Sequence, residues 1–391
     1  MPIGFLILVG AIALAAGGGE SDSSAPQEIP APGLSTVAAL GEQLFRDKTL
    51  SVSGELACES CHRPEFAHAA PPEEVVSKGG ARMDRTGIRN SPSIRYASFT
   101  PAFGYDAEGT PFGGLFRDGR VPTLAAQAER PFLDARELAN ASPADVIARL
   151  ARSPNADRFR AVFGADALEH PEAAFRQLAA AIAQFQVENP DFHRFDSKYD
   201  AWLAGRASLS AQEERGLALF EDPKKGNCAA CHPSRPSADG RPPLFTDFTY
   251  DNVGVPRNAR LPANADASFH DLGLCGPERK DLAARREFCG AFKVPTLRNV
   301  ARTAPYFHNG AIASLRDVVE FYVTRDTAPG DWYPSGAGGP HKFNDLPAGL
   351  VAAVNTSEVP YDRKPGERPA LTPAEIDDVV AFLRTLDDGY N

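Results

Sequence analysis

Two pentads decide what this chain folds around: Cys58-Glu59-Ser60-Cys61-His62 and Cys228-Ala229-Ala230-Cys231-His232. In a Cys-x-x-Cys-His pentad each cysteine sulfur can bond one vinyl group of a haem, and the adjacent histidine can ligate the iron. A zinc site is the alternative, because Cys-x-x-Cys is also a zinc spacing. A zinc ribbon would need a second Cys-x-x-Cys close by, and it would leave the adjacent histidine without a role. The sequence therefore predicts two covalently bound haem c groups and a redox protein.

The composition limits the class of protein. Of the 391 residues, 43% are hydrophobic and 24% are charged, which is usual for a globular chain of two or three domains. The formal net charge of -10 argues against nucleic acid or an anionic membrane surface as a partner. The 34 prolines and 33 glycines predict long irregular connections between helices of modest length. Because no long strand pattern is present, we expect a mainly α fold with long irregular loops.

The N-terminal segment is typical of an exported protein. Residues 3–16 are apolar but too few to span a bilayer, and small residues and a polar Ser- and Pro-rich stretch follow them. We interpret residues 1–19 as a signal peptide and residues 20–33 as a flexible linker, although no Lys or Arg precedes the apolar run, so that the true start can lie upstream. Export to a Gram-negative periplasm suits haem c, which is attached on the oxidising side of the membrane, and it leaves no membrane span in the mature chain. In that compartment Cys275 and Cys289 are expected to form a disulfide, with two free buried thiols as the alternative.

Each pentad stands within the same succession of helices. The pattern Gly-x-x-Leu-Phe precedes both pentads, at residues 41–45 and 216–220. An amphipathic helix closes each unit, with apolar stripes at residues 175–185 and 376–383. Helix, haem pentad, long loop and closing helix describe a cytochrome c domain. We therefore predict two tandem cytochrome c-like domains with one covalent haem c each, residues 34–190 and residues 191–391.

The ligand on the other face of each haem decides its chemistry. A Met ligand makes an electron carrier, whereas an open face lets peroxide or oxygen bind. The chain contains only Met1, which goes with the signal peptide, and Met83, which lies in a charged stretch between glycines. At most one haem can therefore have a Met ligand, which argues against an ordinary electron carrier. The residue types alone leave His, Tyr or no ligand open.

Long strings in the second half resemble a known family. Residues 292–310, which run from Phe292-Lys293-Val294-Pro295 to Phe307-His308-Asn309-Gly310, are similar to the signature of the bacterial di-haem cytochrome c peroxidase and MauG superfamily. The strings at residues 272–277, 321–327 and 332–334 most resemble the MbnH-like branch, the di-haem enzymes of methanobactin operons. The resemblance extends over nearly the whole mature chain.

The resemblance implies that the second haem transfers electrons and is ligated by His232 and Tyr322. Members with a Met ligand carry it fourteen residues after the signature histidine, here His308, and that position is Tyr322 in this chain. In the MauG and MbnH branches the position is also Tyr, and a phenolate is a hard anionic donor that stabilises a higher iron charge. The alternative for Tyr322 is a core aromatic residue of a helix. His308, as part of the signature, is expected at the cofactor site.

The resemblance also implies that the first haem is the peroxidatic one, with an open distal face. Gln127, Pro131 and Glu137 stand at the spacings of the family's distal residues. Glu137 would carry a proton from one peroxide oxygen to the other, and Gln127 would donate a hydrogen bond to bound oxygen. The alternative for Glu137 is a solvated position at the start of a helix.

Two expectations concern the space between the haems. The family binds calcium there through an Asn side chain and backbone carbonyls, and Asn90, Thr303 and Pro305 occupy the matching places. The alternative for Asn90 is a turn residue. The family also commonly has a Trp ten residues before the distal Gln, where this chain has Arg117. Electron exchange between the haems would then use another route, such as Phe116, or be weaker.

Three other residues are weaker candidates. His68 could face the first haem, but it follows His62 by only six residues, which is a short segment to pass round the edge of a macrocycle. Trp202 and Trp332, the only tryptophans, could be surface relays for oxidising a protein partner. The alternative for both is a structural aromatic residue.

The resemblance implies an exported di-haem c oxidoreductase. It would use hydrogen peroxide, hold two oxidising equivalents in a high-valent state of both haems, and oxidise a periplasmic protein partner, at a Trp, by long-range electron transfer. One alternative is a cytochrome c peroxidase that takes electrons from a small cytochrome c. The other is a non-enzymatic di-haem electron carrier, in which Glu137 and Gln127 would have no purpose.

Overall fold

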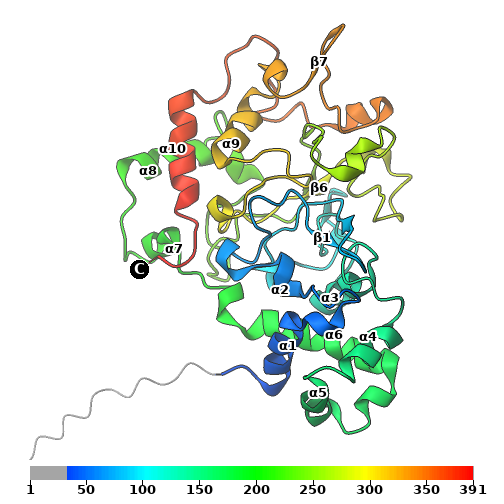
Figure 1. Cartoon of the computed structure of the whole chain (residues 1–391). Helices are drawn as coiled ribbons and strands as arrows, with labels where there is room; N and C mark the ends of the chain where they lie inside the picture. Colours follow the sequence, from blue (N-terminus) through cyan, green and yellow to red (C-terminus); the bar gives the residue numbers. More distant parts are fainter. Residues whose placement is uncertain (1–32, 391) are drawn as a thin grey trace, which may run out of the picture. The chain divides into compact units, whose positions relative to one another are not determined.

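The computed structural model describes residues 33–390, so the predicted signal peptide and almost all of the linker lie outside the described residues. Leu34–Asn391 cluster into one compact unit. The unit is mainly helical with long loops, as predicted (Figure 1). Its α-helices are α1 Thr36–Arg46, α2 Cys58–Cys61, α3 Leu124–Leu133, α4 Pro143–Leu150, α5 Ala156–Phe163, α6 Pro171–Glu188, α7 Lys198–Leu203, α8 Ala211–Glu221, α9 Leu315–Thr324 and α10 Pro373–Arg384.

The strands are only two residues long and pair antiparallel, β1 with β2, β3 with β4, β5 with β6, and β7 with β8. They act as local ties between loops and build no sheet layer. Their bounds are β1 Lys78–Gly79, β2 Arg85–Thr86, β3 Gly104–Tyr105, β4 Pro111–Phe112, β5 Tyr250–Asp251, β6 Phe292–Lys293, β7 Ser335–Gly336 and β8 Gly339–Pro340.

A first hydrophobic core forms where α1, α3, α4 and α5 pack around the long helix α6. The predicted apolar stripe of α6 is buried in it, including Phe175 and Phe185. Gly41 of α1 faces the backbone of α6 so closely that a Cβ there would lie 1.9 Å from the carbonyl oxygen of Ala181. Only glycine allows this approach, which brings Phe45 against Phe185 with 5.6 Å between ring centroids.

A second core repeats the arrangement with α7, α8, α9 and α10 (Figure 1). A Cβ at Gly216 of α8 would lie 2.0 Å from the carbonyl oxygen of Asp378 in α10. Phe220 then packs on Phe382, with 5.1 Å between ring centroids. The Gly-x-x-Leu-Phe pattern that precedes each pentad is thus the sequence of a helix crossing, in which the glycine permits contact and the Phe fills the core beside it.

The helix starts follow from capping side chains. Ser210 accepts a hydrogen bond from the backbone N–H of Glu213, whose carboxylate accepts in turn from the N–H of Ser210, and this capping box starts α8. The same reciprocal pair, Thr372 and Glu375, starts α10. These boxes hold the start of each helix in the crossing that carries the second core.

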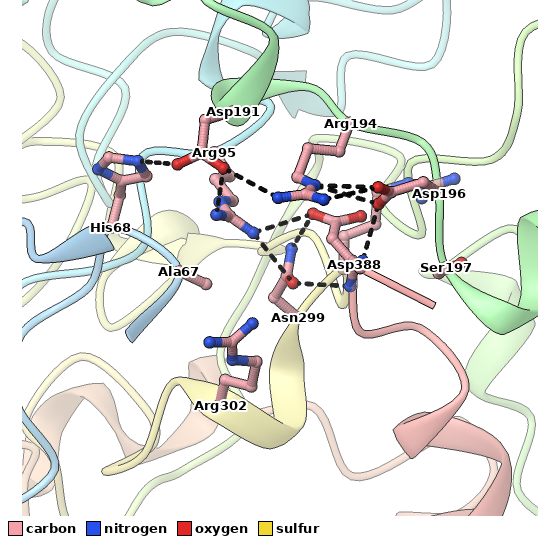
Figure 2. Close-up of polar contacts among 12 residues, drawn as sticks. Ala67, His68, Arg95, Asp191, Arg194, Asp196, Ser197, Asn299, Arg302 and Asp388 are labelled. Carbon is pink, nitrogen blue, oxygen red and sulfur yellow. Dashed lines mark hydrogen bonds and ion pairs between the residues drawn. The ribbon is translucent and has the colours of Figure 1, made fainter. Parts of the chain in front are cut away.

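A buried polar cluster joins loops from both halves of the chain (Figure 2). We call His68, Arg95, Asp191, Asn299 and Asp388 the polar junction. Arg95 donates to Asp191 at 2.8 Å and to Asp388 at 3.3 Å, and Asn299 donates to Asp388 at 2.6 Å. His68 Nε2 lies 2.8 Å from Asp191 Oδ2. Because these partners are far apart in sequence, the junction ties the first half of the chain to its last residues.

The two cores draw on different halves, the first on residues 34–192 and the second on residues 199–386. The division into domains at residue 190 stays a prediction, because Leu34–Asn391 form a single unit. The predicted disulfide between Cys275 and Cys289 is present. Among residues 33–390, no helix has the length and apolarity needed to cross a membrane.

Candidate functional site

One cavity gathers the residues predicted for the first haem. They line it together: Cys58, Cys61, His62, Gln127, Pro131 and Glu137. The two cysteines and the histidine come from α2 and the residue that ends it, and the other three come from α3 and the loop after it. Residues 293–296 of the second half complete the wall. The cavity therefore lies between segments of both halves.

The imidazole of His62 is oriented by its Nδ1 atom. This nitrogen lies 3.2 Å from the carbonyl oxygen of His68 and 3.2 Å from that of Pro92, so Nδ1–H is the donor and Nε2 is left without the proton. Burial lowers the pKa of His62 to about 4, which keeps the ring neutral. A neutral imidazole with a fixed tautomer is the form that ligates iron.

Glu137 opens onto this cavity. Protein surrounds the side chain, and its accessible surface faces the cavity that the first pentad lines. Burial, together with the nearby carboxylate of Asp134, raises the pKa of Glu137 to about 7. A carboxyl group with a pKa near neutrality can both accept and donate a proton, which is what a proton shuttle requires.

Cations surround the cavity, and most of them meet carboxylates. Ion pairs join Arg89 to Asp118 and Asp271, Arg95 to Asp191 and Asp388, Arg120 to Asp118, and Arg136 to Asp134 and Glu278. Lys78, another lining residue, is exposed. Arg117 and Lys293 differ, because within residues 33–390 no carboxylate lies at ion-pair distance from either, and their hydrogen bonds go to neutral oxygens.

The second pentad is built differently. Cys228 lies in a 3₁₀ turn, Cys228–Ala230, and His232 Nδ1 donates to the carbonyl oxygen of Phe245 at 2.7 Å. Burial lowers the pKa of His232, which again leaves a neutral imidazole. Both sites thus share a histidine held by a backbone carbonyl, with its other nitrogen available to iron.

Tyr322 lies beside this second pentad. Burial raises the pKa of Tyr322 far above its usual value, and negative charge on Asp251, Cys231 and Cys228 adds to the effect. The phenol is therefore neutral by itself, and a bound metal cation is what would favour its phenolate form. The neighbourhood of Tyr322 and the Cys228–Cys231 pair supports the predicted ligand, which stays a prediction.

Aromatic side chains lead outward from Tyr322. Its ring centroid lies 6.1 Å from that of Phe321, and Phe321 lies 5.4 Å from Trp332. Trp332 is half-buried, and its indole N–H donates to Thr324 at 2.8 Å. Trp202, also half-buried, stacks near Tyr199 at 5.2 Å in the second core. Tyr199 in turn packs on Phe245, with 5.4 Å between ring centroids, and the Phe245 carbonyl accepts from His232. Both tryptophans therefore connect to the second pentad, Trp332 through Tyr322 and Trp202 through Tyr199 and Phe245.

Two predicted histidines lie elsewhere. His68 bonds to Asp191 through Nε2 and stacks on Phe192 at 4.3 Å, so its imidazole belongs to the polar junction and not to the open face of a haem. His308 stacks on Phe292 with 3.8 Å between centroids, and its Nε2 lies 3.4 Å from Asp345. Its contacts include neither pentad, so the structure does not bring His308 together with the cofactor residues.

One of the three residues expected to bind calcium, Asn90, is engaged by a guanidinium. Arg117 donates to both oxygens of Asn90, to the backbone carbonyl at 3.1 Å and to the side-chain oxygen at 3.1 Å. The predicted ligands at Thr303 and Pro305 are backbone carbonyls; the side-chain hydroxyl of Thr303 donates within its own turn, to the carbonyl oxygen of Val300. A calcium ion would have to compete with a guanidinium for the Asn90 oxygens.

Sequence reasoning missed several residues of the sites. Lys293 was part of the quoted signature, but nothing in the string says that its side chain turns toward the first cavity. Arg120 lies with its guanidinium 3.5 Å from the ring centroid of Phe116, the residue considered as a route between haems. Tyr361 packs 5.9 Å from Tyr322. The contact of Tyr361 joins distant segments, and the Arg120–Phe116 contact, although only four residues apart, lies in a loop without a periodic pattern that would predict it.

The chain is similar to known proteins over most of its length. The family described as di-haem cytochrome c peroxidase matches residues 35–208. The methylamine utilization protein MauG of Paracoccus denitrificans (strain Pd 1222) is 37% identical over 367 residues, which cover 91% of this chain and 90% of that protein.

Two solved structures share the fold. The diheme peroxidase BthA from Burkholderia thailandensis E264 is 40% identical with a TM-score of 0.82, and the match covers 90% of this chain and 86% of that chain. A MauG-like protein associated with microbial copper homeostasis is 29% identical with a TM-score of 0.64, and the match covers 94% of this chain and 96% of that chain.

Proposed function

Because the chain belongs to the di-haem cytochrome c peroxidase and MauG family, we propose that this di-haem enzyme uses hydrogen peroxide to oxidise a protein partner at a Trp side chain. Two electrons withdrawn from the partner would reduce the peroxide to water. The enzyme class and the haem cofactors follow from the family, whereas the partner and the oxidised group are the proposal.

The observation that supports this function best is the difference between the two pentads. The first opens onto a cavity with Glu137, whose pKa is near neutrality. Beside the second lies the buried phenol of Tyr322, which packs against Tyr361. An open site with a proton shuttle suits a small oxidant, and a closed site with an aromatic path to the surface suits electron transfer.

The residues of the first site have distinct roles. Haem iron held by His62 would supply the redox chemistry. The Glu137 carboxylate would accept a proton from one peroxide oxygen and return it to the other, because its pKa lets it do both at neutral pH. The Gln127 side-chain amide would hold the oxidant by donating a hydrogen bond. Pro131, which has no N–H, would line the cavity without a competing donor.

The residues of the second site would carry electrons from the partner. Tyr322, Phe321 and Trp332 form a continuous aromatic path with centroid distances of 6.1 Å and 5.4 Å. Trp332 is half-buried, so part of its indole is open to a docked protein. This path lets the enzyme oxidise a group that never enters the first cavity.

Two observations support export to the periplasm. The disulfide between Cys275 and Cys289 suits an oxidising compartment, where haem c is also attached. The apolar segment at residues 3–16 has the length of a signal peptide. Calcium has no part in the proposed function, because Asn90, one of its predicted ligands, already accepts two hydrogen bonds from Arg117.

The proposal is tested with the holoenzyme and a candidate periplasmic partner. Electron paramagnetic resonance should show one high-spin and one low-spin ferric haem. After peroxide is added, mass spectrometry should find oxygen added to one Trp of the partner. Trp332→Phe should slow oxidation of the partner and leave the reaction of peroxide with the enzyme unchanged. Trp202→Phe interrupts the other aromatic route, through Tyr199 and Phe245, and should slow oxidation of the partner less, because the proposed path runs through Tyr322. Two low-spin haems that ignore peroxide would instead indicate an electron carrier.

The name of the matching family favours one alternative, a cytochrome c peroxidase that draws electrons from a small cytochrome c. Rapid turnover of reduced cytochrome c with peroxide, without oxidation of any protein Trp, would identify that function. The same aromatic path would then serve as the electron entry.

A further inference from the structure

The surroundings of Arg117 carry an inference about charge at the first haem. Arg117 stands where the resemblance implies a Trp, and its guanidinium contacts the residue that the resemblance assigns to calcium. We propose that the first haem site contains no calcium, because Arg117 supplies the positive charge there and, with Lys293, faces the two haem carboxylates. This inference rests on haem c at the first site and not on the identity of the substrate.

The first step is the complete use of Asn90. Its two oxygens accept from the guanidinium of Arg117, both at 3.1 Å. Its backbone N–H donates to the carbonyl oxygen of His308 at 2.7 Å, and its side-chain N–H donates to that of Val75 at 3.3 Å. All four polar groups of this buried side chain and its peptide are therefore engaged. A metal ion bound to either oxygen of Asn90 would therefore lie directly beside the positive charge of Arg117.

The second step is the position of Arg117 itself. Its carbonyl oxygen accepts from the backbone N–H of Lys293 in β6, which fixes the residue against the second half of the chain. Arg89, the residue before Asn90, has its charge balanced by Asp118 and Asp271. A divalent cation at Asn90 would thus lie against the guanidinium of Arg117, which has no carboxylate at ion-pair distance among the described residues and would repel it. The arrangement replaces a metal ion with a cation that the chain carries covalently.

The third step is the charge that Arg117 and Lys293 leave unbalanced. Both line the cavity of the first pentad, and both donate to neutral oxygens of Asn90 and Gly114. The other arginines of the cavity have carboxylate partners. An enclosed cation without an anion is costly, so the two cations need negative charge from what the cavity binds. Haem c carries two carboxylates, which match the two cations in number and charge.

Calcium content and reduction potential test the proposal. The wild-type holoenzyme, after dialysis against calcium-free buffer, should contain well below one calcium per chain by elemental mass spectrometry. Its spin states and melting temperature should not change with a chelator such as EGTA. Because positive charge near the iron favours the ferrous form, Arg117→Leu and Lys293→Met should each lower the potential of the first haem. Arg117→Lys, which keeps the charge, should stay close to the wild type.

Arg82→Leu is the matched control, since Arg82 is exposed and pairs only with Asp84 outside the cavity. One calcium per wild-type chain, or a chelator-induced change of spin state, would overturn the proposal. So would potentials of the Arg117→Leu and Lys293→Met variants that equal that of Arg82→Leu. If a variant does not fold, the calcium content of the wild type decides by itself. None of these readouts depends on the substrate, so they stand apart from the proposed function.

Discussion

Tyr322 and Tyr361 lie with their ring centroids 5.9 Å apart, one beside the other next to the second pentad. Both are enclosed, and burial raises the pKa of each. Only Tyr322 stands at the position that the family resemblance assigns to an iron ligand. The predicted iron ligand Tyr322 can therefore be compared with Tyr361, a neighbouring tyrosine in the same environment.

Replacing Tyr322 by Phe should remove the low-spin ferric signal of the second haem. The potential of that haem should rise, because an anionic oxygen donor no longer stabilises the ferric form. Tyr361→Phe, which deletes a neighbouring hydroxyl, should leave the signal in place. Paramagnetic resonance and redox titration of the two variants measure this. An unchanged low-spin signal in Tyr322→Phe would show that Tyr322 is a core aromatic.

Replacing Glu137 by Gln should slow the reaction of the first haem with peroxide by about 100-fold or more, because the proton shuttle is lost. In the wild type the rate should fall as the pH drops below about 7, since the carboxylate that accepts the proton becomes protonated there. Stopped-flow absorbance over a pH series measures both. Glu129→Gln, on α3 but not at the cavity, serves as the control. A pH-independent rate would rule out Glu137 as the base.

The elevated pKa of Glu137 also makes the stability of the fold depend on pH. Its pKa in the folded state, about 7, exceeds the ordinary value of 4.5, so the folded protein holds the proton more tightly than the unfolded chain does. The group therefore stabilises the fold at low pH and loses that contribution as the pH rises from about 4.5 through 7. Glu137→Gln should remove this part of the pH dependence in denaturant unfolding of the holoenzyme.

Replacing Gly41 by Ala should destabilise the protein by about 2 kcal/mol, because a Cβ would meet the carbonyl oxygen of Ala181 at 1.9 Å and force α1 away from α6. Gly338→Ala, where a Cβ has no neighbour within 4 Å, should change little. Thermal unfolding of the two holoenzyme variants measures the difference. Equal melting temperatures would mean that the crossing of α1 and α6 can widen without loss.

Replacing Asp388 by Asn should cost about 3 kcal/mol, because the buried guanidinium of Arg95 loses one of its two charged partners. Asp196→Asn, beside the polar junction in Figure 2, should cost less than about 1 kcal/mol, since the side chains of the Arg194–Asp196 pair are 39% and 40% exposed. Guanidinium chloride unfolding compares them. Similar losses in both would mean that burial of the junction does not matter.

Local patterns predicted the helical fold, the apolar stripes of α6 and α10, and the disulfide. These succeed because each depends on residues close in sequence or on a pairing with no competitor. The gathering of Gln127, Pro131 and Glu137 with the first pentad was also predictable, through the family spacing. The reason for Gly41 was not, because a glycine that permits a helix crossing looks like any other until its partner helix is known.

Contacts between distant loops lay beyond the sequence. His68 was considered for a haem face, yet its partner Asp191 lies 123 residues away. The sequence shows that Arg117 departs from the family pattern, but not that its guanidinium contacts Asn90, 27 residues earlier. The calcium prediction included the oxygens of Asn90, which already accept hydrogen bonds from Arg117. Spacing identifies the residue types at a site, while charge balance depends on which loops meet.

Asp388 stands three residues before the end of the 391-residue chain, and its carboxylate accepts from Arg95, Tyr96 and Asn299. Since synthesis proceeds from the N-terminus, the anion that accepts from Arg95 in the polar junction is made 293 residues after that arginine. Until then the first half lacks this partner, whatever else of the chain has emerged. A chain that stops before Asp388 would thus keep both haem motifs and lose the contacts of this carboxylate with Arg95, Tyr96 and Asn299.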